Sequence, residues 1–313
     1  MKHIFFILAF LWSATAIAQN KKEESFSIIA FGDMPYFLPD DFRRFENLIQ
    51  VVNNQTQEFN VHVGDIKSSK TLCTEEYYNK IYNYFEQFKR PLIYTPGDNE
   101  WTDCGGKAAG SYDPEERLTV LRKLFFKTQT SFGKNKIDLI AQSESLAYSK
   151  FVENKRWDFH SVSFGTVHLV GTNNFFIPDS KNFNREFYER DNANVNWLNE
   201  IFEHARKNDS AGIILFTQAD MFSPNKPSSG FVRVLTELKK LVIDFKKPVI
   251  LVNGDSHKFL VDKPFIDESS HRTISNFTRI QVFGEYDIHA VKIIVNPTDQ
   301  SFFHVDQLMV GGN

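Results

Sequence analysis

Five short apolar segments of this chain each end in an acidic or amide residue or a histidine. They cover residues 26–33, 59–65, 91–99, 212–218 and 248–257. Segments with the apolar spacing of amphipathic helices lie between and around them, at residues 42–53, 75–89, 115–127, 194–207 and 230–245. Strand, polar turn and helix in this repeated order predict a parallel β-core that is covered by helices.

The last part of the chain has a different pattern. Residues 277–283, 288–296 and 301–308 are typical of strands separated by short turns, as is the stretch 161–170, and we expect antiparallel pairing in both places. The predicted fold is therefore α/β, a four-layer α-β-β-α sandwich of two mixed β-sheets flanked by helices. Because no linker or repeat divides residues 19–313, we expect them to form a single domain.

Residues 1–18 precede this domain and have the features of a secretory signal peptide. Lys2 and His3 are followed by an apolar run over residues 4–12 and by small residues that end at Ala18. The run is too short to cross roughly 30 Å of hydrocarbon, and no later apolar run reaches the length of a membrane span. We expect cleavage near Ala18 and a secreted or periplasmic protein.

The charge balance argues against one class of partner. The chain has 36 Lys and Arg residues against 39 Asp and Glu residues, for a net charge of −3, and it contains no basic block. A polyanion such as DNA or RNA needs a basic surface to hold it. The composition therefore does not predict a surface that binds nucleic acid, and a small molecule is the expected partner.

The chain contains two cysteines, Cys73 and Cys104. In an exported protein they can pair, and closing a loop of this length stabilises a fold by roughly 3 kcal/mol in the chain-entropy model. The alternative is a pair of metal ligands, which would need further Cys or His residues at ligand spacing beside them. The sequence has none there, so it favours a structural disulfide.

Four carboxylates follow strand-like segments, namely Asp33, Asp65, Asp98 and Asp255. In α/β sheets, ligands bind beyond the carboxyl ends of the strands, so these side chains should face one crevice. A single Asp after Gly is more often a helix cap than a ligand. Four carboxylates in one crevice would repel one another and raise their own pKa values unless a cation were bound. The pattern therefore predicts one or two divalent metal ions.

The order of these residues resembles that of the calcineurin-like metallophosphoesterases, to which the purple acid phosphatases are related. The matching positions are Asp33 with Pro35, Gly64-Asp65, Gly97-Asp98-Asn99-Glu100, Gln218 and Gly254-Asp255-Ser256-His257. The resemblance covers about residues 26–260. It implies the fold of that family and the metal-dependent hydrolysis of a phosphate mono- or diester by attack of a metal-bridging hydroxide.

The resemblance also implies a set of metal ligands. One ion would contact Asp33, Asp65 and His257, with Tyr36 as a further ligand or a pocket wall. A second ion would contact Asp65, Asp98, Gln218 and Asp255. Several family histidines are replaced here by residues with oxygen donors, and oxygen-rich sets suit Mg²⁺, Mn²⁺ or Ca²⁺ better than Zn²⁺.

The resemblance gives the catalytic roles to Asp65, Asp98 and Asn99. Asn99 replaces a family histidine and can orient phosphate, but an amide cannot protonate a leaving group. Asp220 is a candidate replacement acid, and Glu100 is a candidate metal or pocket residue. The substitutions leave a second hypothesis open, in which the protein binds metal or phosphate on the same fold without catalysis. A purely structural or adhesive role is the third.

Other polar residues allow two interpretations each. Arg185, Arg190 and Lys226 could clamp a phosphate, although such charges usually face solvent. His62 lies inside a predicted strand, where a core histidine is more common than a ligand. His168 is interpreted as a surface or strand residue.

Overall fold

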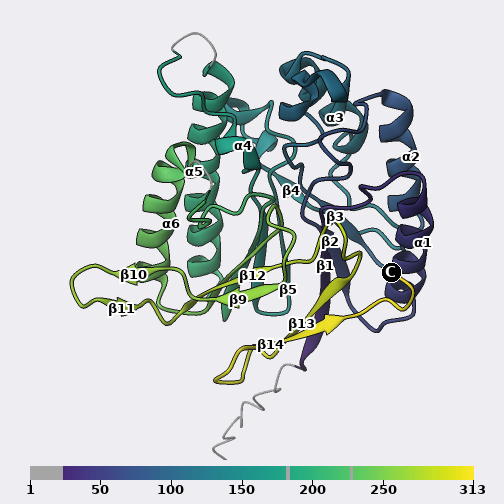
Figure 1. Cartoon of the computed structure of the whole chain (residues 1–313). Helices are drawn as coiled ribbons and strands as arrows, with labels where there is room; N and C mark the ends of the chain where they lie inside the picture. The colour runs from purple at the N-terminus through teal and green to yellow at the C-terminus, as the bar shows by residue number, and fades with distance from the viewer. Residues whose placement is uncertain (1–23, 181–183, 226–227) are drawn as a thin grey trace, which may run out of the picture.

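The structure is a computed structural model, and it describes residues 24–180, 184–225 and 228–313. The predicted signal peptide and Lys226 lie outside these residues. Within them, two β-sheets pack face to face, and helices cover the outer face of each sheet (Figure 1). The predicted four-layer α-β-β-α sandwich is therefore confirmed.

The first sheet has the strand order β14-β13-β1-β2-β3. Its strands are β1 (Phe26–Phe31), β2 (Phe59–His62), β3 (Leu92–Tyr94), β13 (Ala290–Val295) and β14 (Phe303–Leu308). Strands β1, β2 and β3 are parallel, whereas β13 is antiparallel to both β1 and β14. The helices of this half are α1 (Asp40–Asn53), α2 (Glu75–Phe85) and α3 (Pro114–Phe125).

The second sheet has the order β4-β5-β6-β7-β8-β12-β9. Its strands are β4 (Ile140–Ala141), β5 (Lys155–Phe159), β6 (Val162–Thr166), β7 (Gly212–Phe216), β8 (Val249–Asn253), β12 (Phe277–Gln281) and β9 (Leu260–Asp262). Strands β6, β7, β8 and β12 are parallel, and the outer strands pair antiparallel. Helices α5 (Arg185–Lys207) and α6 (Val232–Phe245) cover this sheet.

Shorter elements connect these layers. They are the helix α4 (Gly171–Asn174), the hairpin β10 (Ile266–Asp267) and β11 (Arg272–Thr273), and the 3-10 turns η1 (Thr102–Gly105), η2 (Lys107–Ala109), η3 (Gln142–Glu144), η4 (Leu146–Tyr148) and η5 (Ser229–Phe231). Among the described residues, no helix is both long and apolar enough to cross a membrane.

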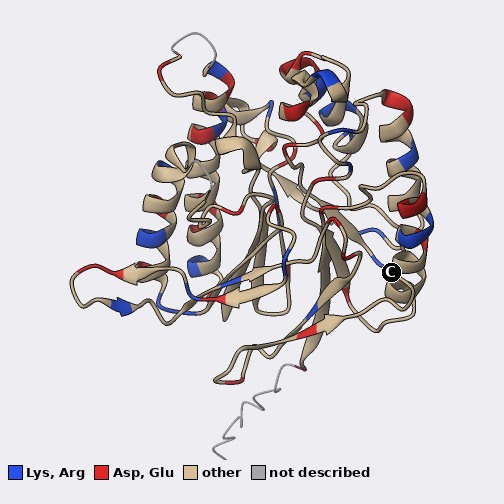
Figure 2. Ribbon diagram, viewed as in Figure 1, with Lys and Arg blue, Asp and Glu red and all other residues tan. Residues whose placement is uncertain are grey.

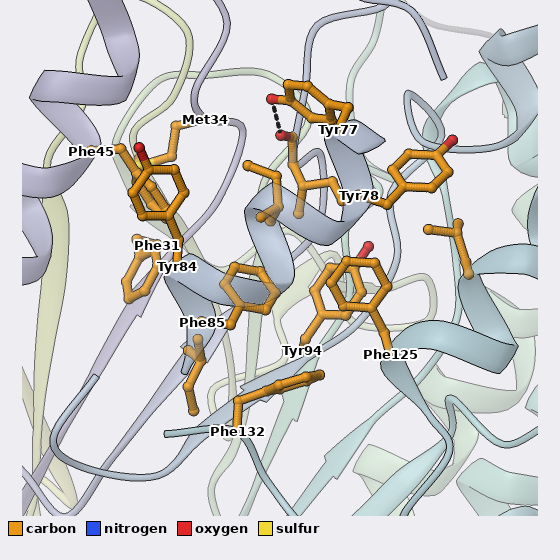
Figure 3. Packing of buried hydrophobic residues seen from close by; sticks show 14 of the residues in the cluster. Phe31, Met34, Phe45, Tyr77, Tyr78, Tyr84, Phe85, Tyr94, Phe125 and Phe132 are labelled. Atoms are coloured by element: carbon orange, nitrogen blue, oxygen red, sulfur yellow. Dashed lines mark hydrogen bonds between the residues drawn. The ribbon is translucent and has the colours of Figure 1, made fainter. Parts of the chain in front are cut away.

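Alternating side chains of the strands divide the core into three layers. Ile28 and Ala30 of β1 face the second sheet, whereas Ile29 and Phe31 of the same strand face the helices of the first half. In that outer layer Phe31 packs against Phe45 of α1, and aromatic side chains of α2 and α3 belong to the same cluster (Figure 3). Successive side chains on a strand point to opposite faces, so a strand with cover on both sides is buried along its whole length, as β1, β7 and β8 are. Charged residues lie mainly on helices and loops (Figure 2).

Two expectations about the elements differ from the structure. Strand β12 is parallel to β8, so the three tail strands divide between the two sheets instead of forming one antiparallel set. All five of its residues are buried, as is usual for a parallel strand with cover on both faces. Helix α5 begins at Arg185 rather than at residue 194. Its first turns are mostly polar, so they lack the apolar spacing from which the helix was predicted.

Candidate metal centre

The residues predicted to bind metal lie in the loops that follow β1, β2, β3, β7 and β8. Backbone hydrogen bonds join these loops: the amide of Asp33 donates to the carbonyl of Gly64 at 3.0 Å, and the amide of Met34 donates to that of Asp65 at 3.0 Å. The amide of Asp255 donates to Asp33 Oδ1 at 3.0 Å, which connects the second sheet to the first. The fold thus places the ends of both sheets against each other.

Four of these residues have an unusual backbone conformation. The φ angles of Asp33, Asp65, Asp255 and His257 are 54°, 56°, 71° and 60°. Non-glycine residues adopt this left-handed region only at a cost, and such residues gather at functional sites. Close packing accompanies the strain, because a Cβ on Gly254 would lie 2.2 Å from Asp33 Oδ2. The observed geometry therefore requires glycine at position 254.

One group of side chains in the described part of the chain has the geometry of a metal site. Asp33, Asp65 and His257 each offer a ligand atom, and these atoms lie within 4.8 Å of one another. The hydroxyl of Tyr36 is 2.8 Å from Asp65 Oδ2 and 3.4 Å from His257 Nε2. Two carboxylates, an imidazole nitrogen and a phenol oxygen form a donor set that fits a divalent cation.

Glu285 completes this group from behind. Its Oε2 lies 3.2 Å from His257 Nδ1, so the other ring nitrogen faces Asp33 and Tyr36. Histidine ligands in metalloproteins usually have such a carboxylate on their second nitrogen, where it fixes the orientation of the ring. Glu285 follows β12, far from the other motifs in sequence, and the sequence analysis missed it.

The residues expected around a second ion are connected by hydrogen bonds. Gln218 Nε2 donates to Asp98 Oδ1 at 3.0 Å, and the amide of Gly171 donates to Gln218 Oε1 at 2.6 Å. Asp98 Oδ2 accepts a hydrogen bond from Thr172 Oγ1 at 2.7 Å. Asp255 Oδ2 accepts one from the backbone of Asp220 at 2.9 Å. Gln218 therefore presents its amide nitrogen, and not its oxygen, to Asp98.

Asn99 holds Asp65 instead of facing outward as a phosphate donor. Its backbone amide donates to Asp65 Oδ1 at 3.1 Å. Its side-chain nitrogen donates to Asp65 Oδ2 at 2.9 Å and to the hydroxyl of Tyr36 at 2.8 Å. A primary amide has two N–H bonds, so both are used within the protein. This differs from the expected role of Asn99 in orienting phosphate.

Glu100 and Lys67 support the loops from beneath. Glu100 Oε1 accepts hydrogen bonds from the amides of Asp65 and Gly97 and from the hydroxyl of Tyr94, at 3.1, 2.6 and 2.7 Å. Lys67 is fully buried, and its ammonium donates to the carbonyl of Asn99 at 2.5 Å and to that of Ser68 at 3.0 Å. Glu100 thus lies behind the site and not in it, and a buried ammonium lies under the carboxylates. A lysine two residues after Asp65 gave no signal in the sequence.

The electrostatics of the site show the crowding that the sequence predicted. Burial raises the pKa of Asp65 well above its usual value, and the neighbouring carboxylates of Asp98 and Glu100 raise it further. Burial, followed by the charge of Asp255, raises the pKa of Asp98 to about 7. Burial also raises the pKa of the Tyr36 hydroxyl, which keeps it protonated. A bound cation would relieve this repulsion.

A pocket of about 550 Å³ opens above these residues. Asp65, Asp98, Asn99, Asp255 and His257 lie at its base. Its other lining residues come from the loops after β1, β2 and β12, and they are Tyr36, Phe37, Leu38, Asp40, Ser68, Ser69, Lys70, Thr71 and Glu285. The pocket is large enough for a small organic molecule.

The other candidate residues lie in ion pairs. Asp220 accepts hydrogen bonds from Arg279 and from Ser256, both at 2.6 Å, so it is held as a partner of Arg279 and does not serve as a free acid. Arg190 is fully buried and paired with Glu186 at 2.9 Å, well inside the protein. Arg185 is exposed and lies 3.5 Å from Glu115. Neither arginine lines the pocket.

Two histidines are buried away from the site. His62 packs among aromatic rings, and burial lowers its pKa to about 3, so it is a neutral core histidine as expected. His168 was expected at the surface or in a strand, but it lies buried 2.8 Å from Glu153. Because Arg122 also binds Glu153, this buried charge is paired.

Cys73 and Cys104 form a disulfide. The bond joins the segment after β2 to the segment after β3, and these are the segments that hold Asp65, Asp98 and Asn99. A disulfide indicates an oxidising compartment.

Comparison with known proteins identifies the fold. No family model matches the chain, and no curated protein matches its sequence. Among solved structures, a dimetal phosphatase from Danio rerio superposes with a TM-score of 0.54 at 10% identity, over 91% of this chain and 99% of that one. PhoD superposes with a TM-score of 0.52 at 10% identity, over 87% of this chain and 64% of that one.

A third similar structure is GAP50, the anchor in the inner membrane complex of Plasmodium. Its TM-score is 0.50 at 13% identity, over 92% of this chain and 90% of that one. At such identities the likeness concerns the fold alone. The chain has the fold of the calcineurin-like metallophosphoesterases, as the sequence motifs predicted.

Proposed function

We propose that this protein is a metal-dependent phosphoesterase that hydrolyses a small phosphate mono- or diester. The observation that supports this best is the group of Asp33, Asp65 and His257, whose ligand atoms lie within 4.8 Å of one another below an open pocket. It occurs on a fold that phosphatases share. The oxygen-rich donor set favours Mg²⁺, Mn²⁺ or Ca²⁺ over Zn²⁺.

The pocket itself needs a cation before it can accept a phosphate. Its base has the carboxylates of Asp65, Asp98 and Asp255, and these would repel an anion. A divalent ion held by Asp33, Asp65 and His257 would attract the phosphate, polarise its oxygens and make water a better nucleophile at neutral pH. The exposed Lys70 at the mouth can approach an anionic group of the substrate.

The residues around the site favour a leaving group that needs little protonation. Asn99 replaces the family's histidine, and an amide is not an acid at working pH. Asp220 is bound to Arg279, and the raised pKa of Tyr36 makes its hydroxyl a weak acid. Aryl esters should therefore be cleaved much faster than alkyl esters.

We further propose where the protein acts and what its catalytic unit is. Residues 1–18 would be removed as a signal peptide, and residues 19–313 would act as one domain in the periplasm or outside the cell. The disulfide Cys73–Cys104 supports an oxidising compartment.

The test combines metal analysis with hydrolysis assays. The purified protein should hold a divalent metal and cleave p-nitrophenyl phosphate or bis-p-nitrophenyl phosphate when Mg²⁺, Mn²⁺ or Ca²⁺ is added. Asp65→Ala should abolish turnover, whereas Asp306→Ala, an exposed aspartate on β14, should not. A protein with neither metal nor turnover would refute the proposal.

A second candidate function is metal binding without catalysis. Two observations favour it: both side-chain N–H bonds of Asn99 are used on Asp65 and Tyr36, and GAP50, an anchor, shares the fold. Bound metal without turnover of either ester would support this alternative.

A further inference from the structure

We infer that the centre holds one divalent ion, because hydrogen bonds occupy the half of the site that would bind a second. This inference deepens the proposed function and depends on it. It concerns Gln218, Asp98 and Asp65, three of the four residues expected around a second ion. Their hydrogen-bond partners decide which of their atoms remain available to a cation.

The orientation of the Gln218 amide is set by a backbone group. The N–H of Gly171 can only donate, and it lies 2.6 Å from one terminal atom of Gln218, so that atom must be the oxygen. The nitrogen then lies on the other side, 3.0 Å from Asp98 Oδ1. An amide nitrogen is a donor and does not bind a metal ion. Gln218 therefore gives Asp98 a hydrogen bond but offers no ligand atom to a metal ion beside Asp98.

The hydrogen bonds of Asp65 leave room for one ion contact. A carboxylate has about four lone-pair positions. Three donors already point at Asp65: the backbone and side-chain nitrogens of Asn99 and the hydroxyl of Tyr36, at 3.1, 2.9 and 2.8 Å. The remaining position can serve one cation, whereas a bridging ligand needs two.

Lys67 places a buried ammonium in the same region. Its buried ammonium binds the carbonyl of Asn99, and the charges of Asp65 and Asp98 act on it. A charge of this sign offsets part of the carboxylate repulsion and opposes the approach of a second cation. The ammonium of Lys67 and the side-chain amides of Gln218 and Asn99 thus stabilise the carboxylates that a second ion would otherwise stabilise.

Gly171 maintains this arrangement. A Cβ at this position would lie 2.5 Å from Asp98 Oδ2 and 2.9 Å from Asp255 Oδ1, closer than real Cβ atoms approach other atoms. Glycine thus lets the backbone reach the Gln218 oxygen between the two carboxylates. The backbone N–H of Gly171 thereby fixes the Gln218 amide with its nitrogen, and not its oxygen, toward Asp98.

The test is the binding stoichiometry of Mn²⁺, measured by calorimetry and elemental analysis on the full mature protein. We expect one Mn²⁺ per chain and the resolved hyperfine pattern of an isolated Mn²⁺ in electron paramagnetic resonance. Asp33→Asn should abolish binding. The matched change Asp98→Asn should keep one ion, bound up to about tenfold more weakly because a negative charge near Asp65 is lost.

The outcomes separate the two proposals. Two ions per wild-type chain, an exchange-coupled spectrum, or loss of one ion in Asp98→Asn would overturn the single-ion inference and leave the phosphoesterase proposal standing. No bound ion at all would overturn both. Circular dichroism of each variant checks that a loss of binding is not a loss of folding, and the wild-type stoichiometry decides the question even if a variant fails to fold.

Discussion

Replacing Asp98 with asparagine should stabilise the metal-free protein at neutral pH and above. Burial and the charge of Asp255 raise the pKa of Asp98 to about 7 in the folded chain. In the unfolded chain it should return to about 4. Between these two values the folded chain keeps a proton that the unfolded chain loses, so the free energy of unfolding of the wild type falls as pH rises.

The size of this effect follows from the same two values. A tenfold change in proton affinity corresponds to about 1.4 kcal/mol, so a pKa that rises from about 4 to about 7 costs the folded state roughly 4 kcal/mol once pH exceeds 7. Asparagine avoids this cost because it has no charge. It can also keep both contacts, since its oxygen can accept from Gln218 and its nitrogen can donate to the hydroxyl of Thr172.

The assay is urea unfolding of both proteins in EDTA at several values between about pH 4.5 and 8. The advantage of Asp98→Asn should grow from about 1 kcal/mol at the acid end to roughly 4 kcal/mol at the alkaline end. Asp267→Asn is the control, because its pKa is lowered to about 2 and it should change stability by the same amount throughout this range. A difference between wild type and Asp98→Asn that does not vary with pH would refute the reasoning.

Three further predictions concern the support of the site. Lys67→Met should raise Mn²⁺ affinity by about tenfold in calorimetry, because it removes a like charge near Asp65, whereas Lys155→Met, a change at another buried lysine, should leave affinity unchanged. A lower affinity in Lys67→Met would show that the hydrogen bonds of Lys67 to the loop carbonyls matter more for metal binding than its charge does. Glu285→Gln should weaken Mn²⁺ binding about 10- to 100-fold, with an unchanged affinity as the contrary result. Reduction of the Cys73–Cys104 bond should lower the free energy of unfolding by roughly 3 kcal/mol in denaturant titrations, and equal midpoints for both redox forms would contradict this.

The strands that make up the parallel parts of the two sheets could be predicted because their signals are local. Apolar runs that end in Gly-Asp mark β1, β2 and β8, and the ends of parallel strands meet at one edge. These signals placed Asp33, Asp65 and His257 at strand ends, and the family resemblance grouped them as the ligands of one ion. The position of β12 could not be predicted, because a local apolar pattern does not specify that its partner is β8 of the second sheet rather than a strand of the first.

The directions of individual side chains could not be predicted from the sequence either, because they depend on partners that are distant in the chain. Gln218 could have offered either its oxygen or its nitrogen, and the choice depends on the amide of Gly171, which lies 47 positions away in the chain. The same holds for Glu285, which reaches His257 from a loop after β12. A residue type indicates which donors are available, whereas the partners that use them come from distant loops.

The structures that share this fold include a dimetal phosphatase and an anchor, so the fold alone does not decide between catalysis and binding. The decision depends on what happens at the leaving group. If one ion activates the phosphate and Asn99 provides no proton, turnover must depend steeply on the stability of the departing group. A chain that cleaves aryl esters but not alkyl esters would then be an enzyme limited by its missing acid, whereas a chain that cleaves neither, with the ion in place, would be using the same carboxylates only to bind.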